Sequence, residues 1–165
     1  MDNPFDPSIL KPGDFELFFT EHDPVDTLIG VKTGMWIAHI EIDAGNGQSL
    51  ASRNGIGVNI FPRRTSGLVC VRGPIEPFNF NAGLDWFNTK AKGQGYDWKG
   101  LATATALTTE GEEGKMFCSE FAVNFYRACG YNPCNPSQAS WRTYPRDMWL
   151  MGTFETKWAL NSYYA

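Results

Sequence analysis

The sequence predicts an α+β fold in which a small antiparallel sheet packs against helices. Three segments with strand character lie close together between residues 36 and 72, separated by short turns rich in Gly, Pro, Asp and Asn. Further along, residues 116–129 repeat large apolar side chains at helical spacing. Strands grouped in one part of a chain and helices in another are typical of α+β domains.

Short apolar segments define the expected sheet. A strand is expected after the turn that opens residues 11–20, KPGDFELFFT. Three more strands follow, and their close spacing predicts an antiparallel meander. They are residues 36–42 (WIAHIEI), 56–61 (IGVNIF) and 68–72 (LVCVR), with turns at residues 43–48 and 62–67.

Helices are expected on both sides of these strands. Asp23 followed by Pro24 predicts a helix that ends at Gly34. The other candidates come after the strands, and the clearest of them is the last. They are residues 80–91, residues 97–107 and residues 116–129, where Phe117, Phe121 and Phe125 recur and Gly130 stops the helix.

All 165 residues are expected to form a single domain, because this length supports one core and no repeat or linker interrupts it. The residues from about 131 onward are rich in Pro and Trp and match neither a strand nor a helix pattern. We therefore expect an aromatic C-terminal extension there, without assigned structure.

The charge distribution excludes some function classes. The net charge is −4 and the largest basic cluster is the pair Arg63 and Arg64, so no nucleic-acid partner is expected. No apolar run is long enough to span a bilayer. The first residues lack the basic and apolar regions of a secretory signal, so we expect the protein to be cytoplasmic on synthesis.

The cysteines suggest neither a disulfide framework nor a zinc site. A chain of this length without a signal is not expected to depend on disulfides. The spacing of Cys129 and Cys134 fits no zinc pattern, and the chain has only two histidines. We expect no metal and no cofactor, and we expect Cys70, Cys129 and Cys134 to be ordinary thiols.

Cys118 lies in the first turn of the helix predicted over residues 116–129. Unpaired N–H groups and the positive end of the helix dipole stabilise a thiolate at such a position, and the thiolate is the nucleophilic form. A free cysteine there is more often a small core residue. Position alone therefore does not separate a nucleophile from a core thiol.

His39 lies within the strand predicted over residues 36–42, on the same face as Glu41. An imidazole among apolar residues needs a polar partner, and Glu41 could supply it. A hydrogen-bonded structural histidine and a solvated glutamate are the alternatives. His22 lies in a polar loop near a proline and looks like a surface residue, so His39 is the better candidate for a base.

The order of four segments carries a resemblance to a known family. Residues 11–19 (KPGDFELFF) are similar to its opening strand, 36–42 (WIAHIEI) to its histidine strand, 93–98 (GQGYDW) to its Tyr-Asp segment and 115–126 (KMFCSEFAVNFY) to its nucleophile helix. Together they resemble the permuted NlpC-type branch of the papain-fold cysteine hydrolases, the YiiX-like proteins. In that branch the histidine strand precedes the cysteine helix. The likeness covers residues 11 to about 130.

The resemblance implies a circularly permuted papain-like fold, with the Cys118 helix packed on a small barrel-like sheet. It implies that His39 takes the proton of Cys118 and later protonates the leaving group. It implies that Tyr96 lies beside the nucleophile, where its hydroxyl would bind substrate or oxyanion, and a packing role for Tyr96 is an equal alternative. The N–H of Cys118 is a candidate oxyanion donor.

The third polar residue departs from the family pattern. The family usually carries it on the strand after the histidine strand, and the matching residues 47–57 hold no Glu or His. Gln48, Ser52 and Asn54 are candidates there, and Glu41 is the alternative on the histidine strand itself. A neutral amide can also orient the imidazole.

The resemblance therefore predicts a cysteine peptidase or amidase that acylates Cys118. Peptidoglycan-type peptides are the expected substrates, and a phage-encoded, virion-associated or wall-delivered protein is the expected context. One alternative is a non-catalytic assembly module that reuses the fold and binds a protein partner. Another is the hydrolysis or transfer of lipid acyl groups, as in relatives similar to lecithin:retinol acyltransferase, although residues 154–164 predict no clear amphipathic helix.

Overall fold

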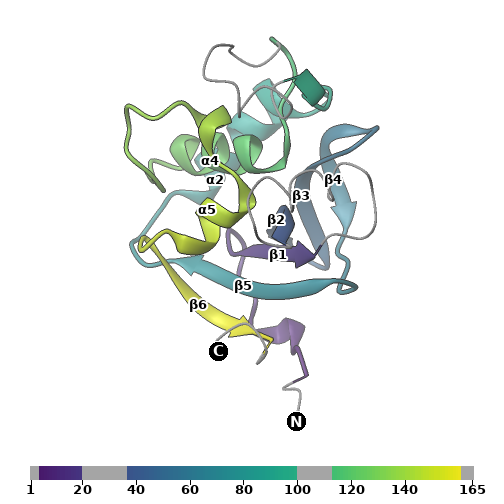
Figure 1. The fold of residues 1–165 in the computed structure, drawn as a ribbon, viewed down its shortest axis with the longest axis vertical. Coiled ribbons are helices and arrows are strands. Elements are labelled where there is room, and N and C mark those ends of the chain that lie inside the picture. The colour runs from purple at the N-terminus through teal and green to yellow at the C-terminus, as the bar shows by residue number, and fades with distance from the viewer. Residues whose placement is uncertain (1–3, 20–36, 100–112, 161–165) are drawn as a thin grey trace.

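A computed structural model describes residues 4–19, 37–99 and 113–160 and has an α+β fold with a six-stranded antiparallel sheet (Figure 1). The strand order is β4-β3-β2-β1-β5-β6. The strands are β1 (Phe15–Phe19), β2 (Ile37–Gly45), β3 (Gln48–Arg53), β4 (Gly57–Pro62), β5 (Leu68–Pro74) and β6 (Phe154–Ala159). The predicted α+β class is confirmed.

The helices gather on one side of this sheet (Figure 1). They are α2 (Phe80–Trp86), which continues as the π-helical turn η2 (Phe87–Ala91), α4 (Cys118–Ala128), the short 3₁₀ turn η3 (Ser140–Arg142) and α5 (Pro145–Leu150). A further 3₁₀ turn, η1 (Pro7–Ile9), lies apart from them near the N-terminus. Among the residues that the structure describes, no helix combines the length and the apolar character needed to cross a membrane. The helix expected from Asp23 to Gly34, His22, and most of residues 97–107 lie outside the described residues.

Strand β3 was not among the predicted strands, because residues 43–48 were expected to form a turn. The turn is shorter, and it is tight because Asn46 and Gly47 both have positive φ values of 53° and 72°. Asp43 therefore already pairs with Ser49. The small residues of QSLASR gave the strand no strong apolar alternation, although four of its six residues are buried.

The predicted meander is wrong at its last strand. β2, β3 and β4 are neighbours, but β5 pairs with β1 and not with β4. Burial explains this placement, since six of the seven residues of β5 are buried and a strand apolar on both faces requires a central position. β4 carries partly exposed residues and takes the edge.

The segment after residue 131 is not an extension without structure. β6 pairs with β5, and α5 precedes it. Buried Arg72 of β5 fixes this segment by donating hydrogen bonds to the carbonyl groups of Met148 (3.1 Å), Trp149 and Phe154. Because these contacts form only in the folded chain, the local sequence pattern contained no sign of them.

The Pro-Gly-Asp turn before β1 anchors the far part of α4. The hydroxyl of Tyr126, a fully buried residue of α4, donates to the Gly13 carbonyl oxygen at 2.8 Å. Gly13 has a φ of 92°, and a Cβ at this position would lie 2.2 Å from the ring of Phe78. Nζ of Lys157 on β6 donates to the two carboxylate oxygens of Asp14, at 2.7 Å and 2.8 Å. The turn thus joins α4 to β6, the strand at one edge of the sheet.

Replacing Gly13 with Ala should lower the free energy of unfolding by about 2–4 kcal/mol, because the methyl group combines a left-handed backbone with a clash against Phe78. Urea unfolding measures the loss. Gly47→Ala is the matched control, since Gly47 also has positive φ but nothing lies within 4 Å of its added Cβ. We expect about 1 kcal/mol for the control. Equal losses in the two variants would show that packing against Phe78 contributes nothing.

Candidate active site

Cys118 is the first residue of α4, and its side chain is 1% exposed. Phe117 is the N-cap residue and offers no side-chain hydrogen bond to the helix start. Glu120 compensates, since its carboxyl group accepts a hydrogen bond from the backbone N–H of Phe117. This contact fixes the backbone next to the cysteine.

Hydrogen bonds from three directions hold the residues around Cys118. The N–H of Met116 donates to the carbonyl oxygen of Gly95 at 3.0 Å. The hydroxyl of Ser52 on β3 donates to the Met116 carbonyl oxygen at 2.5 Å, and the hydroxyl of Ser119 donates to the Thr143 carbonyl oxygen at 2.6 Å. The cysteine therefore lies on a rigid helix start, which is the placement a nucleophile requires.

His39 of β2 lies between Cys118 and Glu41 and is 7% exposed. Its Nε2 lies 3.1 Å from Oε1 of Glu41, and its ring is close enough to the Cys118 side chain for the two groups to interact. Because Nε2 faces Glu41, Nδ1 is the nitrogen left for the sulfur. Burial opposes protonation of His39, but its interactions with Cys118 and Glu41 outweigh burial and raise its pKa to about 9. The Cys118 Sγ is also 3.9 Å from the Ala38 carbonyl oxygen.

Glu41 is fully buried, so the alternative of a solvated strand residue is wrong. Its Oε1 lies 2.9 Å from Nε of Arg53 and 3.3 Å from Nε of Arg64. Burial would raise the pKa of Glu41, but the hydrogen bond and charge of His39, together with those of Arg53, lower it to about 2. Glu41 is therefore an ionised carboxylate.

The other candidates for the third polar residue lie elsewhere. Gln48 and Asn54 are exposed, and the Ser52 hydroxyl binds the Met116 carbonyl oxygen. Of the four candidates, Glu41 is the one that the structure brings to His39.

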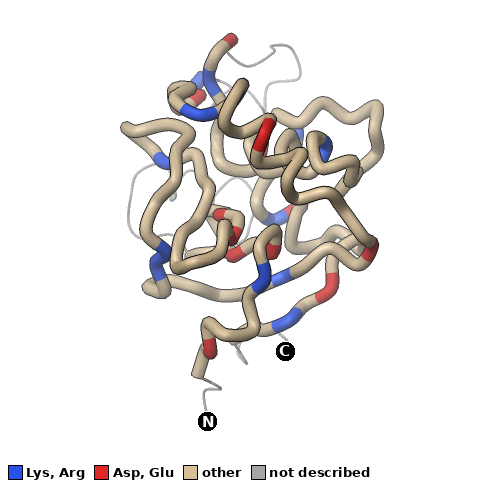
Figure 2. Tube along the Cα trace, turned by 180° about the vertical axis from the view of Figure 1, so that it is seen from behind, with Lys and Arg blue, Asp and Glu red and all other residues tan. Residues whose placement is uncertain are grey.

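A buried layer of opposite charges surrounds Glu41 on this face of the sheet. Glu16 of β1 lies directly opposite Glu41 in the strand register. Ser49 donates to Glu16 Oε2 at 3.3 Å, and Arg63 Nε lies 3.6 Å from Glu16 Oε1 while its Nη2 binds Asp43. Figure 2 shows the acidic positions gathered across the sheet, with basic segments close by. Burial raises the pKa of Glu16 to about 7, against the attraction of Arg63.

Sequence reasoning missed this layer. It treated Arg63 and Arg64 only as a small basic cluster, and it assigned no role to Glu16 or Arg53. The one available signal was the placement of Glu16 among apolar residues in FELFF, because a lone acid in a buried strand requires a cation or a hydrogen-bond donor.

These shifts predict how stability depends on pH. His39, with a folded-state pKa of about 9, stabilises the protein fully below pH 6.5, and this contribution is lost as the pH rises to 9. Glu16 binds its proton more tightly when folded, so stability also falls between about pH 4.5 and 7. The contribution of Glu41 is present above pH 4.5 and is lost as the pH falls towards 2.

We therefore expect the melting temperature to be highest near about pH 5 and to fall steadily towards pH 9. Thermal unfolding followed by circular dichroism tests this. His39→Gln should remove the decline above pH 6.5 while leaving the decline at lower pH in place. A melting temperature that rises from pH 5 to pH 8 would contradict the assigned directions.

Tyr96 packs where the histidine strand meets the cysteine helix. It is buried in a small apolar cluster with Ala38 and Phe117, the residues that immediately precede His39 and Cys118. Its ring contacts Trp98 with 5.3 Å between centroids. The structure thus packs Tyr96 against the residues next to His39 and Cys118, as the packing alternative expects.

The four cysteines are free thiols, and their surroundings differ. Burial raises the pKa of Cys70 and that of Cys129 to about 12, so neither is a thiolate near neutral pH. Cys134 is half-buried, and its Sγ accepts a hydrogen bond from Nη2 of Arg127 at 3.5 Å. Over the ranges 4–19, 37–99 and 113–160, no three His, Cys, Asp or Glu side chains form a group that could hold a metal ion.

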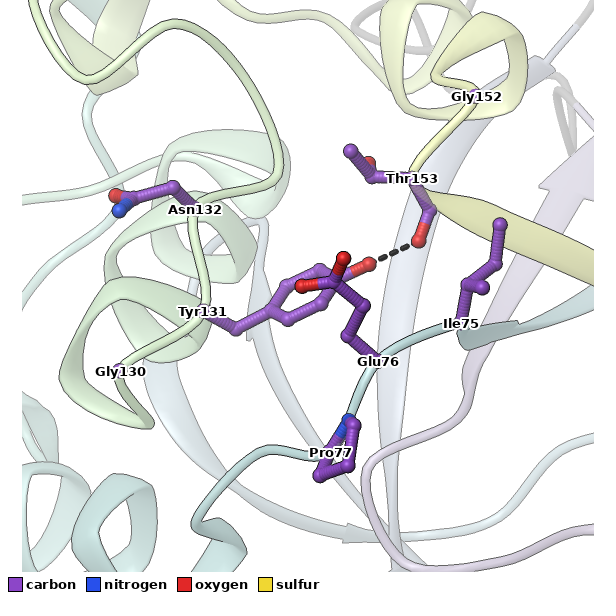
Figure 3. A pocket seen from close by; sticks show the side chains of 8 residues that line it. All are labelled: Ile75, Glu76, Pro77, Gly130, Tyr131, Asn132, Gly152 and Thr153. Atoms are coloured by element: carbon purple, nitrogen blue, oxygen red, sulfur yellow. Dashed lines mark hydrogen bonds between the residues drawn. The ribbon is translucent and has the colours of Figure 1, made fainter.

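A separate pocket of about 360 Å³ lies at the other end of α4 (Figure 3). Glu76 and Tyr131 are among the residues that line it, and the Tyr131 hydroxyl donates to the Thr153 carbonyl oxygen. The full length of α4, roughly 16 Å at 1.5 Å per residue, separates this pocket from Cys118. It contains none of the residues predicted for the site.

Comparison with known proteins gives no relative: no protein-family model matches the chain, and a search of curated proteins finds no match.

Proposed function

We propose that this protein is a cysteine hydrolase of circularly permuted papain-like fold that cleaves an amide bond by acyl transfer to Cys118. One observation supports the proposal above all others. The buried His39 interacts with the Cys118 side chain and is hydrogen-bonded to the ionised carboxylate of Glu41. Nucleophile, base and orienting group in this order form the arrangement that nucleophilic catalysis requires.

The first step follows from this geometry. His39 takes the proton of Cys118, and Glu41 stabilises the imidazolium that forms. The thiolate adds to the substrate carbonyl carbon, which forms an S–C bond and moves an electron pair onto the oxygen. The N–H of Cys118 belongs to the first turn of α4, where N–H groups have no partner within the helix, so it can donate to this oxyanion.

The second step returns the proton. Collapse of the intermediate breaks the C–N bond, and the imidazolium of His39 protonates the departing amine. A water molecule, deprotonated by the neutral imidazole, then attacks the thioester, which releases the carboxylic acid and restores the Cys118 thiol.

Peptidoglycan peptides are the proposed substrates, on the basis of the family resemblance. The test incubates the protein with purified peptidoglycan and measures newly released amino groups, with the products identified by mass spectrometry. Cys118→Ala should abolish release, and Cys134→Ser should retain it, because Cys134 contacts Arg127 and none of the three site residues. Unchanged release by Cys118→Ala would reject the proposal.

A non-catalytic assembly module is the second candidate. The observation in its favour is the 1% exposure of Cys118, because a substrate carbonyl must reach the sulfur. Ile56, Ile75 and Leu150 are more than half exposed and could contribute to a contact surface. Light scattering coupled to gel filtration tests this candidate, and a strictly monomeric protein would count against it.

A further inference from the structure

The negative charge of Glu41, which favours protonated His39, is shared by its two carboxylate oxygens, and Arg53 contacts both of them. Its Nε donates to Oε1 at 2.9 Å and its Nη2 donates to Oε2 at 3.0 Å. His39 shares Oε1 with this guanidinium. Paired parallel hydrogen bonds of this kind are the strongest that arginine forms with a carboxylate.

The surroundings of Arg53 keep this arrangement in place. The guanidinium carbon lies 4.1 Å from the centre of the Phe61 ring on β4. β3 pairs with β2 as Leu50 with Ile42, and Arg53 at the end of β3 pairs with Gly57 of β4. Sheet pairing and stacking on an aromatic ring thus set the position of Arg53 before any substrate binds.

A carboxylate that is paired with a guanidinium attracts a neighbouring proton less strongly than a bare carboxylate does. We propose that Arg53 is a positioning residue that limits the basicity of His39 by sharing the charge of Glu41. This inference rests on the proposed function, since it assigns Arg53 the task of keeping the imidazolium able to release its proton to the leaving amine.

Other charged or titratable groups face His39 and Glu41 from the neighbouring elements. Arg64 reaches Oε1 of Glu41 with one nitrogen at 3.3 Å and stacks on Phe18 of β1, with 4.3 Å from its guanidinium carbon to the ring centre. Arg53 contacts both oxygens, so its effect is the larger. The remaining groups are Cys118 on α4, Glu16 on β1, Asp43 on β2 and Arg63 after β4.

The experiment follows the ring protons of His39 by NMR as a function of pH in a Cys118→Ala background, which removes the thiol from the titration. The chain has two histidines, so His22→Gln assigns the signals. Arg53→Met should raise the midpoint of the His39 titration by about one pH unit, because Glu41 then loses its closest cation. Arg53→Lys keeps a charge without the paired geometry and should raise the midpoint by less.

The sign of the shift separates this role from simple packing. If Arg53 only supported the fold, its loss would loosen the contact between His39 and Glu41 and lower the midpoint. A midpoint that is unchanged or lower in either folded variant overturns the proposal, and the Lys variant alone suffices if the Met variant does not fold. Arg142→Met is the control, since Arg142 also stacks on an aromatic ring, Trp141 at 4.8 Å, and should leave the midpoint unchanged.

The titration needs no turnover, so it can reject the proposed role of Arg53 independently of the hydrolase assay. A raised midpoint without peptidoglycan cleavage would reject the catalytic role and keep the charge sharing. Cleavage that depends on Cys118, with an unchanged His39 midpoint, would support the hydrolase proposal and reject the charge sharing by Arg53.

Discussion

In a His39→Ala variant, the rate at which iodoacetamide labels Cys118 should rise about a hundredfold between pH 6 and pH 8, as it does for an ordinary thiol with a pKa of about 8.5. In the wild-type protein the proposed Cys118–His39 pair predicts that the same rate changes less than about threefold, because the imidazolium of His39 persists to about pH 9. At pH 6 the variant should react about tenfold more slowly, because little of an ordinary thiol is ionised at that pH. The difference is no larger because a stabilised thiolate is also a weaker nucleophile.

Peptide mass spectrometry measures labelling at each cysteine separately, so the chain supplies its own controls. Cys70 and Cys129, whose pKa values burial raises to about 12, should stay almost unlabelled at both pH values in both proteins. Labelling of Cys134 should not depend on His39. If Cys118 of the wild-type protein labels no faster than Cys70, the catalytic hypothesis fails and the assembly module becomes the better explanation.

Glu41→Gln should lower the free energy of unfolding at pH 6 by about 2–4 kcal/mol, because it leaves the guanidinium groups of Arg53 and Arg64 facing a neutral amide inside the protein. Gln has nearly the same shape as Glu, so the loss reports charge and not a cavity. Urea unfolding measures it. The acid-induced decline of stability between about pH 4.5 and 2 should also become shallower, since Glu41 no longer takes up a proton on unfolding.

The matched control is Glu155→Gln on β6, which makes the same chemical change at an exposed strand position. It should alter stability by less than about 0.5 kcal/mol. If the two variants lost the same stability, the charged layer around Glu41 would be a set of weak surface pairs despite its burial.

The predictable part of the fold is the part with large apolar side chains at regular spacing. In α4, Phe121 and Phe125 are both buried as the period predicts. The missed elements lack such a pattern. β3 is built mainly from small residues, α5 has six residues, and β6 (FETKWA) is a strand because Arg72 and β5 hold it there. Long-range contacts decide these elements, and local sequence does not record them.

The site divides in the same way. Cys118 and His39 were candidates from residue type and element position, and Glu41 from the two-residue period of a strand. That Cys118 and His39 meet was expected only from the family resemblance. Arg53 and Arg64 reach Glu41 only through sheet pairing and through the segment after β4. A charged residue at the end of a strand or in the loop after one normally points to solvent, and no local pattern reveals that Arg53 and Arg64 point inward.

Arg72 also constrains the order of events on the ribosome. Its guanidinium donates a hydrogen bond to the carbonyl oxygen of Phe154, which lies 82 residues later in the chain. At 5–20 residues per second, roughly 4–16 s pass between the synthesis of these two residues. During that time β5 has an unpaired edge and a guanidinium without those acceptors, both of which favour chaperone capture or misassociation. Completion of the sheet therefore has to wait for the synthesis of β6, even though β2, the strand that holds His39 and Glu41, emerges early.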